Sequence, residues 1–340
     1  MPRLSTLLGR ASSGPYELSH DYSPGQERWA GWVHVLRAVS IVCGLATVLA
    51  ALATGWLLTG SVAFAAALGA AVGLWPKFLV VSAAVTNTAL VDALCAGAIP
   101  CLLLWLRSQR LRWAAATGAL LGAAALTQVT ALPVAGLLLA VLVTFAWRWA
   151  DWRAVLLALG CFAALCGWWY VRNAILYGNP LATGATVHYL SRDPALAGLI
   201  RNPPELSWAV LRSSLTGLGR STWYDGGWNQ LLLPAAVNIA VWVAAAASLG
   251  AGFVSALRGK LVLAAAAIGS LVGWVLLIRY TTQPEGRYLL VAIVPWATFL
   301  VAGAMALAAR RAAASWAWPA IFLAIDAYVL AKWLIPFAHL

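Results

Sequence analysis

Long apolar stretches separated by short polar gaps make up the chain from residue 33 to its C-terminus. A helix needs roughly 17 to 25 mostly apolar residues to cross a bilayer, so this pattern predicts about ten membrane helices. Their expected bounds are approximately 33–57, 61–82, 88–106, 113–127, 131–147, 154–172, 232–257, 261–278, 288–309 and 316–337. The predicted fold is therefore all-α: a polytopic transmembrane helix bundle of about ten helices with one large outer loop.

Basic residues cluster in the short gaps that fall on alternate turns of the chain. Four such gaps hold one acid, Asp151, and nine basic residues, which are Arg107, Arg110, Arg112, Arg148, Arg153, Arg258, Lys260, Arg310 and Arg311. Short loops rich in Lys and Arg stay cytoplasmic, so we expect these gaps on the inner side of the cell's inner (plasma) membrane. The expected organisation is an extracytoplasmic segment at 1–32 and a multi-helix transmembrane domain at 33–340, with its large loop, 173–231, outside.

Composition argues against a water-soluble fold. The chain is 63% apolar and 9% charged, with a mean hydropathy of +0.85, whereas soluble domains are about 25% charged. A net charge of +12 would suit nucleic acid, but the basic residues are dispersed at segment ends and form no basic face with interleaved aromatic side chains. We therefore expect membrane lipids and lipid phosphates as partners, and no nucleic acid.

Polar side chains at the expected outer ends of the helices are few, and they are the first candidates for a functional site. They are Lys77, Asn87, Arg172, Asn173, Arg287 and Tyr288. An ionisable side chain in a membrane helix costs a few kcal/mol, so each one needs a partner or a water-filled cavity. Two interpretations stay open: these side chains line one outward-facing cavity, or the cations extend separately to lipid head groups.

The sequence holds no spacing typical of a metal site, no Gly-x-Ser-x-Gly and no phosphate-binding glycine loop after a strand. No metal ligands are predicted. His188 in the outer loop and His20 beside Asp21 are the outward-facing histidines that could take part in acid-base chemistry.

Five runs of residues occur in an order seen in a known class of membrane enzyme. They are LRAVSIVCG at 36–44, WPKFLVVSAAVTN at 75–87, ALTQVTALP at 125–133, WWYVRNAILYGNP at 168–180 and QPEGRYLL at 283–290. Through them, most of 33–310 resembles bacterial membrane glycosyltransferases of the GT-C class, and is similar in particular to protein O-mannosyltransferases and a large bacterial branch of them. The more specific pieces are the Arg-Asn pair with its Tyr-Gly-x-Pro turn, and the later Gly-Arg-Tyr.

The resemblance implies a GT-C-like scaffold and an enzyme that takes a sugar from a polyprenyl-phosphate carrier on the outer membrane face. In that scheme a carboxylate of the first outer loop is the general base, and basic side chains neutralise the departing phosphate. The substrate-binding residues implied are Lys77, Asn87, Arg172, Asn173, Tyr177, Arg287 and Tyr288. The lipid-linked sugar is then the donor, and a divalent cation stays open as a cofactor.

The N-terminal part departs from the family pattern. In the family a membrane helix precedes the first outer loop and its catalytic acid, whereas this chain begins about where that loop ends. The run GPYEL at 14–18 resembles a weakened remnant of the family's proline- and tyrosine-rich entry to the next helix. The local carboxylates that could replace the base are Glu17, Asp21 and Glu27. Three interpretations follow: a glycosyltransferase with a substitute base or a partner, a truncated or inactive relative, or a polytopic transporter or lipid flippase.

Overall fold

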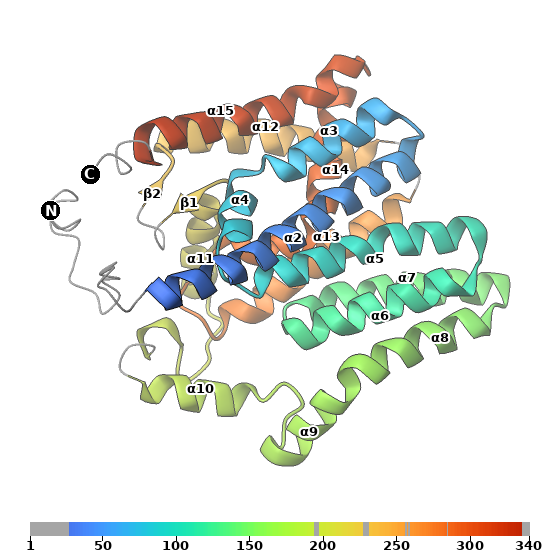
Figure 1. Cartoon of the computed structure of the whole chain (residues 1–340), viewed down its shortest axis with the longest axis vertical. Coiled ribbons are helices and arrows are strands. Elements are labelled where there is room, and N and C mark those ends of the chain that lie inside the picture. The colour runs from blue at the N-terminus through green and yellow to red at the C-terminus, as the bar shows by residue number, and fades with distance from the viewer. Residues whose placement is uncertain are drawn as a thin grey trace, which may run out of the picture.

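The computed structural model describes residues 27–193, 197–226, 231–255, 257, 259–283 and 285–334, which fold almost entirely into helices (Figure 1). The first half holds α2 (Glu27–Thr59), α3 (Val62–Gly73), α4 (Pro76–Ala83), α5 (Thr88–Ser108), α6 (Leu111–Thr127), α7 (Ala131–Trp149), α8 (Trp152–Phe162), the π-helix η1 (Ala163–Gly167) and α9 (Trp168–Tyr177). Then follow α10 (Thr183–Arg192), η2 (Ala197–Leu199), α11 (Trp208–Ser221) and the antiparallel strands β1 (Asp225–Gly226) and β2 (Leu231–Leu232). The last part holds α12 (Ala235–Val254), α13 (Lys260–Ile278), η3 (Gly286–Ala292), α14 (Ile293–Leu307), η4 (Ala312–Trp316), α15 (Ala317–Val329) and η5 (Leu330–Leu334).

The prediction of an all-α, multi-pass bundle is confirmed. Within the described residues eight helical segments are long and apolar enough to cross a membrane, and the bent pair α3 and α4 would make a ninth. Each of the ten stretches expected from the sequence contains a helix; the fourth is α6, which has 17 residues. The sequence pattern therefore located the helices correctly but did not show that the second stretch is broken.

The break between α3 and α4 has a local cause. Pro76 occupies the first turn of α4, where its missing N–H costs nothing, while its ring disfavours helical geometry at the preceding residue, Trp75. The two helices meet at a bend of 61°. As a result α4 turns across the end of the bundle and brings Lys77 toward the segments that cover it.

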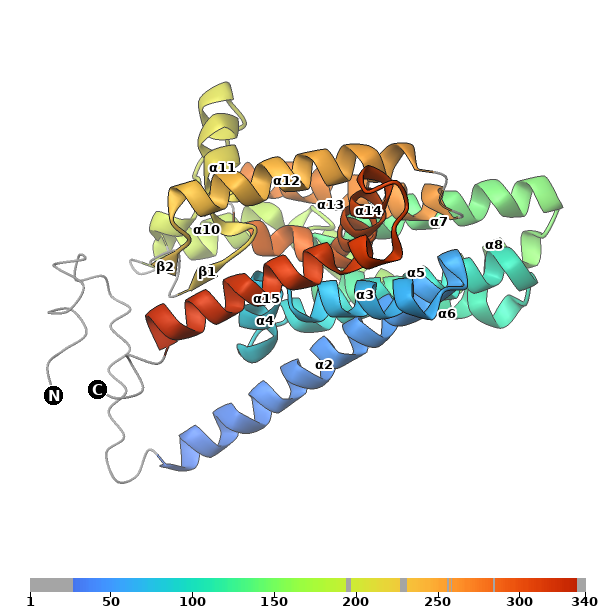
Figure 2. The same ribbon diagram turned by 90° about the horizontal axis from the view of Figure 1, so that it is seen from above.

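The two ends of the bundle carry different elements (Figures 1 and 2). One end carries the short turns that follow α2, α5 and α7, and Gly259, in the turn before α13, lies there against Leu58 and Leu103. The basic residues around positions 107–112 and 148–153 belong to this end. The opposite end carries α10, α11, β1 and β2, so the structured loop and most of the clustered basic charge are separated by the length of the bundle.

The large loop is more ordered than a simple connection. The sequence placed it at 173–231, whereas α9 continues to Tyr177 and the connection to α12 runs over 178–234. The short helix expected around 204–215 is present as α11. Figure 2 shows α11 standing out from the bundle beside α12.

Glycine lets α12 and α14 pack with their backbones in contact. A Cβ on Gly303 of α14 would overlap the carbonyl oxygen of Ser248, and a Cβ on Gly252 of α12 would overlap that of Phe299. Small residues allow such close approach, and in lipid this packing replaces much of the hydrophobic driving force between helices. Gly250, also on α12, meets nothing within 4 Å.

Gly303→Ala is expected to lower the free energy of unfolding by about 1–3 kcal/mol, because overpacking forces the helices apart. Gly250→Ala is the matched control and should be neutral or slightly stabilising, since alanine favours a helix. Thermal unfolding of the detergent-solubilised protein measures both. Equal stability of the two variants would contradict the close packing of α12 on α14.

Candidate functional site

Lys77 lies in a buried cluster of charges at the end of the bundle that carries the structured loop. The exposed fraction is 3% for Lys77, 4% for Asp225 and 5% for Glu285. The Lys77 ammonium forms an ion pair with Asp225 and lies 3.7 Å from Oε2 of Glu285. The same Glu285 oxygen is 3.1 Å from Nε of Arg287, so two carboxylates and two cations form one network.

Backbone contacts hold Lys77 and Asp225 in register. The amide of Lys77 donates to the carbonyl oxygen of Trp223 at 2.9 Å, which fixes α4 against the chain just before β1. Asp225 then opens β1, where it pairs with Leu232 of β2. The ion pair therefore joins elements that are 148 residues apart in sequence.

Gly286, between Glu285 and Arg287, lets the backbone lie close to the end of α11. The amide of Gly286 donates to Oγ of Ser221 at 2.8 Å, and a Cβ on Gly286 would lie 2.5 Å from Cα of Thr222. Any larger residue would push the chain away from the end of α11. The Glu-Gly-Arg order thus lets both charged side chains flank a backbone that is pressed against the loop.

Aromatic rings cover the cluster on the side of α15. Trp75 stacks on Trp223 with ring centroids 5.3 Å apart, and Trp223 stacks on Trp318 at 5.8 Å. The indole N–H of Trp75 donates to the carbonyl oxygen of Thr222 at 3.1 Å. Trp75 and Trp223 are close in sequence to Lys77 and Asp225, and all four residues are buried, so the ion pair is shielded from water and its electrostatic interaction is strengthened.

Tyr224 adds a hydroxyl beside the carboxylates. Burial raises the pKa of Tyr224 above its ordinary value, and the nearby negative charges of Asp225 and Asp326 raise that pKa further. The phenol is therefore neutral at physiological pH and can donate a hydrogen bond.

One oxygen of each buried carboxylate has no hydrogen-bond partner among the described residues. These atoms are Oδ2 of Asp225 and Oε1 of Glu285. A buried carboxylate oxygen that lacks a partner costs free energy unless water, an ion or a ligand binds to it. The cluster thus has acceptor capacity that its own ion pairs do not use.

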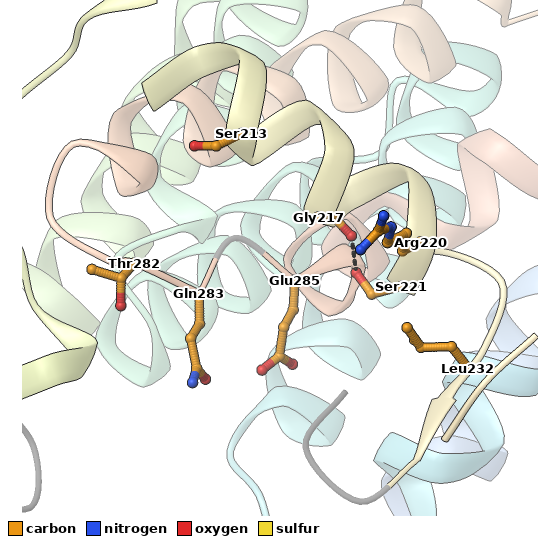
Figure 3. Close-up of a pocket in the computed structure, with 8 residues that line it drawn as sticks. All are labelled: Ser213, Gly217, Arg220, Ser221, Leu232, Thr282, Gln283 and Glu285. Atoms are coloured by element: carbon orange, nitrogen blue, oxygen red, sulfur yellow. Dashed lines mark hydrogen bonds between the residues drawn. The ribbon is translucent and has the colours of Figure 1, made fainter. Parts of the chain in front are cut away.

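A pocket of about 280 Å³ opens beside Glu285 (Figure 3). Its lining residues are Ser213, Gly217, Arg220, Ser221, Leu232, Thr282, Gln283 and Glu285. Figure 3 shows Gln283 and Glu285 extending in the same direction from one segment, with Arg220 on the neighbouring turn of α11. Arg220 is exposed and forms no ion pair with a residue that the structure describes.

Three of the residues selected from the sequence lie together in this cluster. Lys77 and Arg287 both approach Glu285, and Arg287 donates through Nη2 to the hydroxyl of Tyr288 at 3.3 Å. The guanidinium of Arg287 also lies 5.1 Å from the centre of the Tyr288 ring. Their position at helix ends was the signal that identified them.

The other sequence-selected residues lie elsewhere. Arg172 packs over the ring of Trp169 at 5.1 Å and donates to Asn173, whose own amide donates to the carbonyl oxygen of Pro180 at 3.3 Å. Both residues and the exposed Tyr177 are on α9, which lies at the lower edge of Figure 1, away from α4 and β1. Asn87 donates to the carbonyl oxygen of Thr127 at 3.2 Å and so ties the start of α5 to the end of α6.

The candidate bases Glu17 and Asp21, with His20, lie outside the described residues. Asp225, Glu285 and Arg220 were not selected from the sequence. Glu285 is part of the QPEGRYLL run, so the same motif could have identified it. Asp225 and Arg220 lie in a loop where polar and apolar residues are interspersed, so no long apolar run ends beside them and marks them. Within the described chain no group of three or more His, Cys, Asp or Glu side chains could hold a metal ion.

The chain matches no protein-family model, and comparisons with curated proteins and with solved structures found no match either. The GT-C resemblance therefore depends on its sequence motifs alone.

Lys77→Met should lower the free energy of unfolding by about 3–5 kcal/mol, because removal of one partner leaves buried charges uncompensated. Thermal or denaturant unfolding in detergent measures the loss. Lys260→Met, at the opposite end of the bundle, is the control. Among the interactions described, the Lys260 ammonium contacts only the carbonyl oxygen of Ser255, at 3.3 Å. The loss of stability in this variant should therefore be small. The double variant Lys77→Met with Asp225→Asn should lose less than the sum of the two single losses, and strict additivity would contradict the coupling.

Proposed function

We propose that the protein is a membrane glycosyltransferase that uses a polyprenyl-phosphate-linked sugar, with its basic turns in the cytoplasm and the Lys77 cluster at the outer face of the plasma membrane. One observation carries the proposal: two buried carboxylates and two cations lie beside an open pocket, at the end of the bundle opposite most of the clustered basic residues. The charge asymmetry supports the orientation, because basic loops stay in the cytoplasm.

Arg220 is the residue we assign to the donor phosphate. It lines the pocket, and no described carboxylate neutralises it. A guanidinium binds phosphate with paired, charge-assisted hydrogen bonds, and near the membrane surface it can reach the head group of an embedded lipid. Gln283 lines the same pocket, and its side-chain amide can donate a further hydrogen bond to a phosphate oxygen.

Glu285 is the carboxylate we assign as general base. It lines the pocket, and its Oε1 has no partner among the described residues. The contacts of Oε2 with Lys77 and Arg287 hold the carboxylate in place beside the pocket, while Oε1 stays without a partner among the described residues. Glu285 would thus fill the role for which the sequence offered Glu17 and Asp21.

Glu285 and Arg220 take different parts in the proposed sugar transfer. Glu285 takes the proton of an acceptor hydroxyl as its oxygen forms a bond to the anomeric carbon of the sugar. The bond from that carbon to the phosphate oxygen breaks, and its electron pair leaves with the phosphate. Arg220 stabilises the negative charge that develops on the leaving group.

Buried ion pairs within a bundle are also typical of transporters, so the cluster favours transport as the second candidate. The two functions differ in product. A glycosyltransferase releases polyprenyl phosphate from its donor, whereas a transporter moves its substrate unchanged across the bilayer.

Glu285→Gln should lower kcat for transfer by about 100-fold or more, the contribution typical of a general base. The measurement is release of undecaprenyl phosphate from undecaprenyl-phosphate-linked mannose or glucose in proteoliposomes supplied with membrane glycan acceptors. Glu205→Gln, at an exposed carboxylate of the same loop, is the control and should retain activity. Full release by Glu285→Gln would contradict the assignment of the base. A wild-type protein that releases nothing and instead shows flux driven by an ion gradient would favour transport.

Arg220→Ala should weaken binding of undecaprenyl phosphate by roughly 10- to 100-fold, which corresponds to the loss of charged hydrogen bonds worth about 1.5–3 kcal/mol. Titration of the lipid into protein held in neutral-lipid nanodiscs measures this affinity. Arg212→Ala is the matched control, since Arg212 is an exposed arginine on the same helix that does not line the pocket. Equal affinities of the two variants would remove Arg220 from the phosphate site.

A further inference from the structure

A second pocket, of about 360 Å³, lies on the same end of the bundle between α10, the chain at 202–204 and Tyr280. Its lining residues are Thr183, Gly184, Val187, His188, Asn202, Pro204 and Tyr280. None of them is a carboxylate, a lysine or an arginine. In this respect the second pocket differs from the first, whose lining includes both Arg220 and Glu285.

The polar groups of the second pocket offer both donors and acceptors. Thr183 accepts a hydrogen bond from Asn179 at 3.1 Å, which leaves its own hydroxyl hydrogen to donate. Asn202 donates to Ser191 at 3.3 Å, so its carbonyl oxygen can accept from a ligand. His188 adds an exposed imidazole. Tyr280 adds a partly buried aromatic ring, and the guanidinium of Arg279, which is not part of the lining, lies 5.9 Å from the centre of that ring.

The wall that carries Tyr280 is fixed by the backbone. Arg201 donates its amide to the carbonyl oxygen of Tyr280 at 2.8 Å, and its Nε lies 3.3 Å from the carbonyl oxygen of Ile278 and 3.2 Å from that of Thr281. Thr282 donates its amide to the carbonyl oxygen of Leu199 at 3.0 Å. The segment that follows α13 is therefore bound along its length to the large loop, which preorganises the pocket for a ligand.

The same segment lines both pockets. Tyr280 belongs to the second pocket, while Thr282, Gln283 and Glu285 belong to the first. Glu285 follows Tyr280 by five residues, and five residues of extended chain span at most about 18 Å. The backbone positions of Tyr280 and Glu285 are therefore no more than about 18 Å apart. A ligand of two or three linked rings in the second pocket could therefore reach the first.

We infer that the second pocket binds a neutral saccharide. Sugars present hydroxyls that both donate and accept hydrogen bonds and an apolar ring face that packs on an aromatic side chain, which matches this lining. The inference deepens the proposed function and rests on it in one respect. The proposed function is what makes the bound sugar either an acceptor glycan or the sugar of the donor. In either case charge recognition belongs to the pocket of Arg220 and sugar recognition to the pocket of Tyr280.

The test is binding of methyl glycosides of glucose, mannose, galactose and N-acetylglucosamine to the purified protein in nanodiscs, followed by saturation-transfer NMR. At least one should bind with a Kd below about 10 mM. Tyr280→Ala and Asn202→Ala should each weaken that affinity 10-fold or more, while Tyr280→Phe, which keeps the ring, should lose less than Tyr280→Ala. Arg212→Ala, at an exposed residue that lines neither pocket, should leave glycoside binding unchanged.

Absence of glycoside binding by the wild-type protein, or equal binding by Tyr280→Ala with its melting temperature intact, would overturn the inference. Undecaprenyl phosphate affinity, which reports on Arg220, would still test the proposed function independently. Competition distinguishes the two sources of sugar. If undecaprenyl-phosphate-linked sugar displaces the glycoside and undecaprenyl phosphate does not, the pocket binds the sugar of the donor. If neither lipid displaces the glycoside, the pocket binds the acceptor. Both outcomes support a saccharide site.

Discussion

The charge of Lys77 has to be neutralised where the bundle meets its large loop, and this constraint organises that end of the protein. Lys77 is almost fully buried, as are Asp225 and Glu285, which approach it from different segments. A buried charge without a partner is strongly destabilising, so α4, β1 and the entry to η3 cannot separate without exposing or stranding one. The ion pairs therefore hold the loop between α9 and α12 against the helices.

Several otherwise unrelated local features serve this constraint. Pro76 breaks the helix that the hydropathy pattern alone would continue, and the bend turns Lys77 toward the loop. Gly286 permits the chain to press against Thr222, which brings Glu285 within reach of Lys77. The stacked rings of Trp75 and Trp223 then pack the start of α4 against the segment that leads into β1. None of these features would be needed if the loop were a passive connection.

The helices could be predicted from the sequence because lipid imposes a strong contrast: apolar residues persist for the length of a span and stop at its ends. The same contrast identified Lys77, Arg287 and Tyr288, which stand out as polar residues at the edges of apolar runs. It could not identify Asp225 or Arg220, since they lie in a loop where polar and apolar residues are interspersed and no long apolar run ends beside them. It also could not show that Arg172, equally distinct in sequence, lies on α9 beside Trp169, because hydropathy records depth in the membrane and not position around the bundle.

The ion pairs also change what the cations can do for a ligand. Lys77 and Arg287 together carry two positive charges, and Asp225 and Glu285 carry two negative ones, so the buried cluster is neutral as a unit. A neutral cluster has little long-range attraction for a phosphate. The sequence pattern suggested that the three cations Lys77, Arg172 and Arg287 would converge on a lipid phosphate, but two of them are already paired with carboxylates. The cation in the described pocket that lacks an ion pair is Arg220. In the proposed function, anion binding and base chemistry therefore belong to different residues of one pocket, and Lys77 is the counter-charge that holds Glu285 in place.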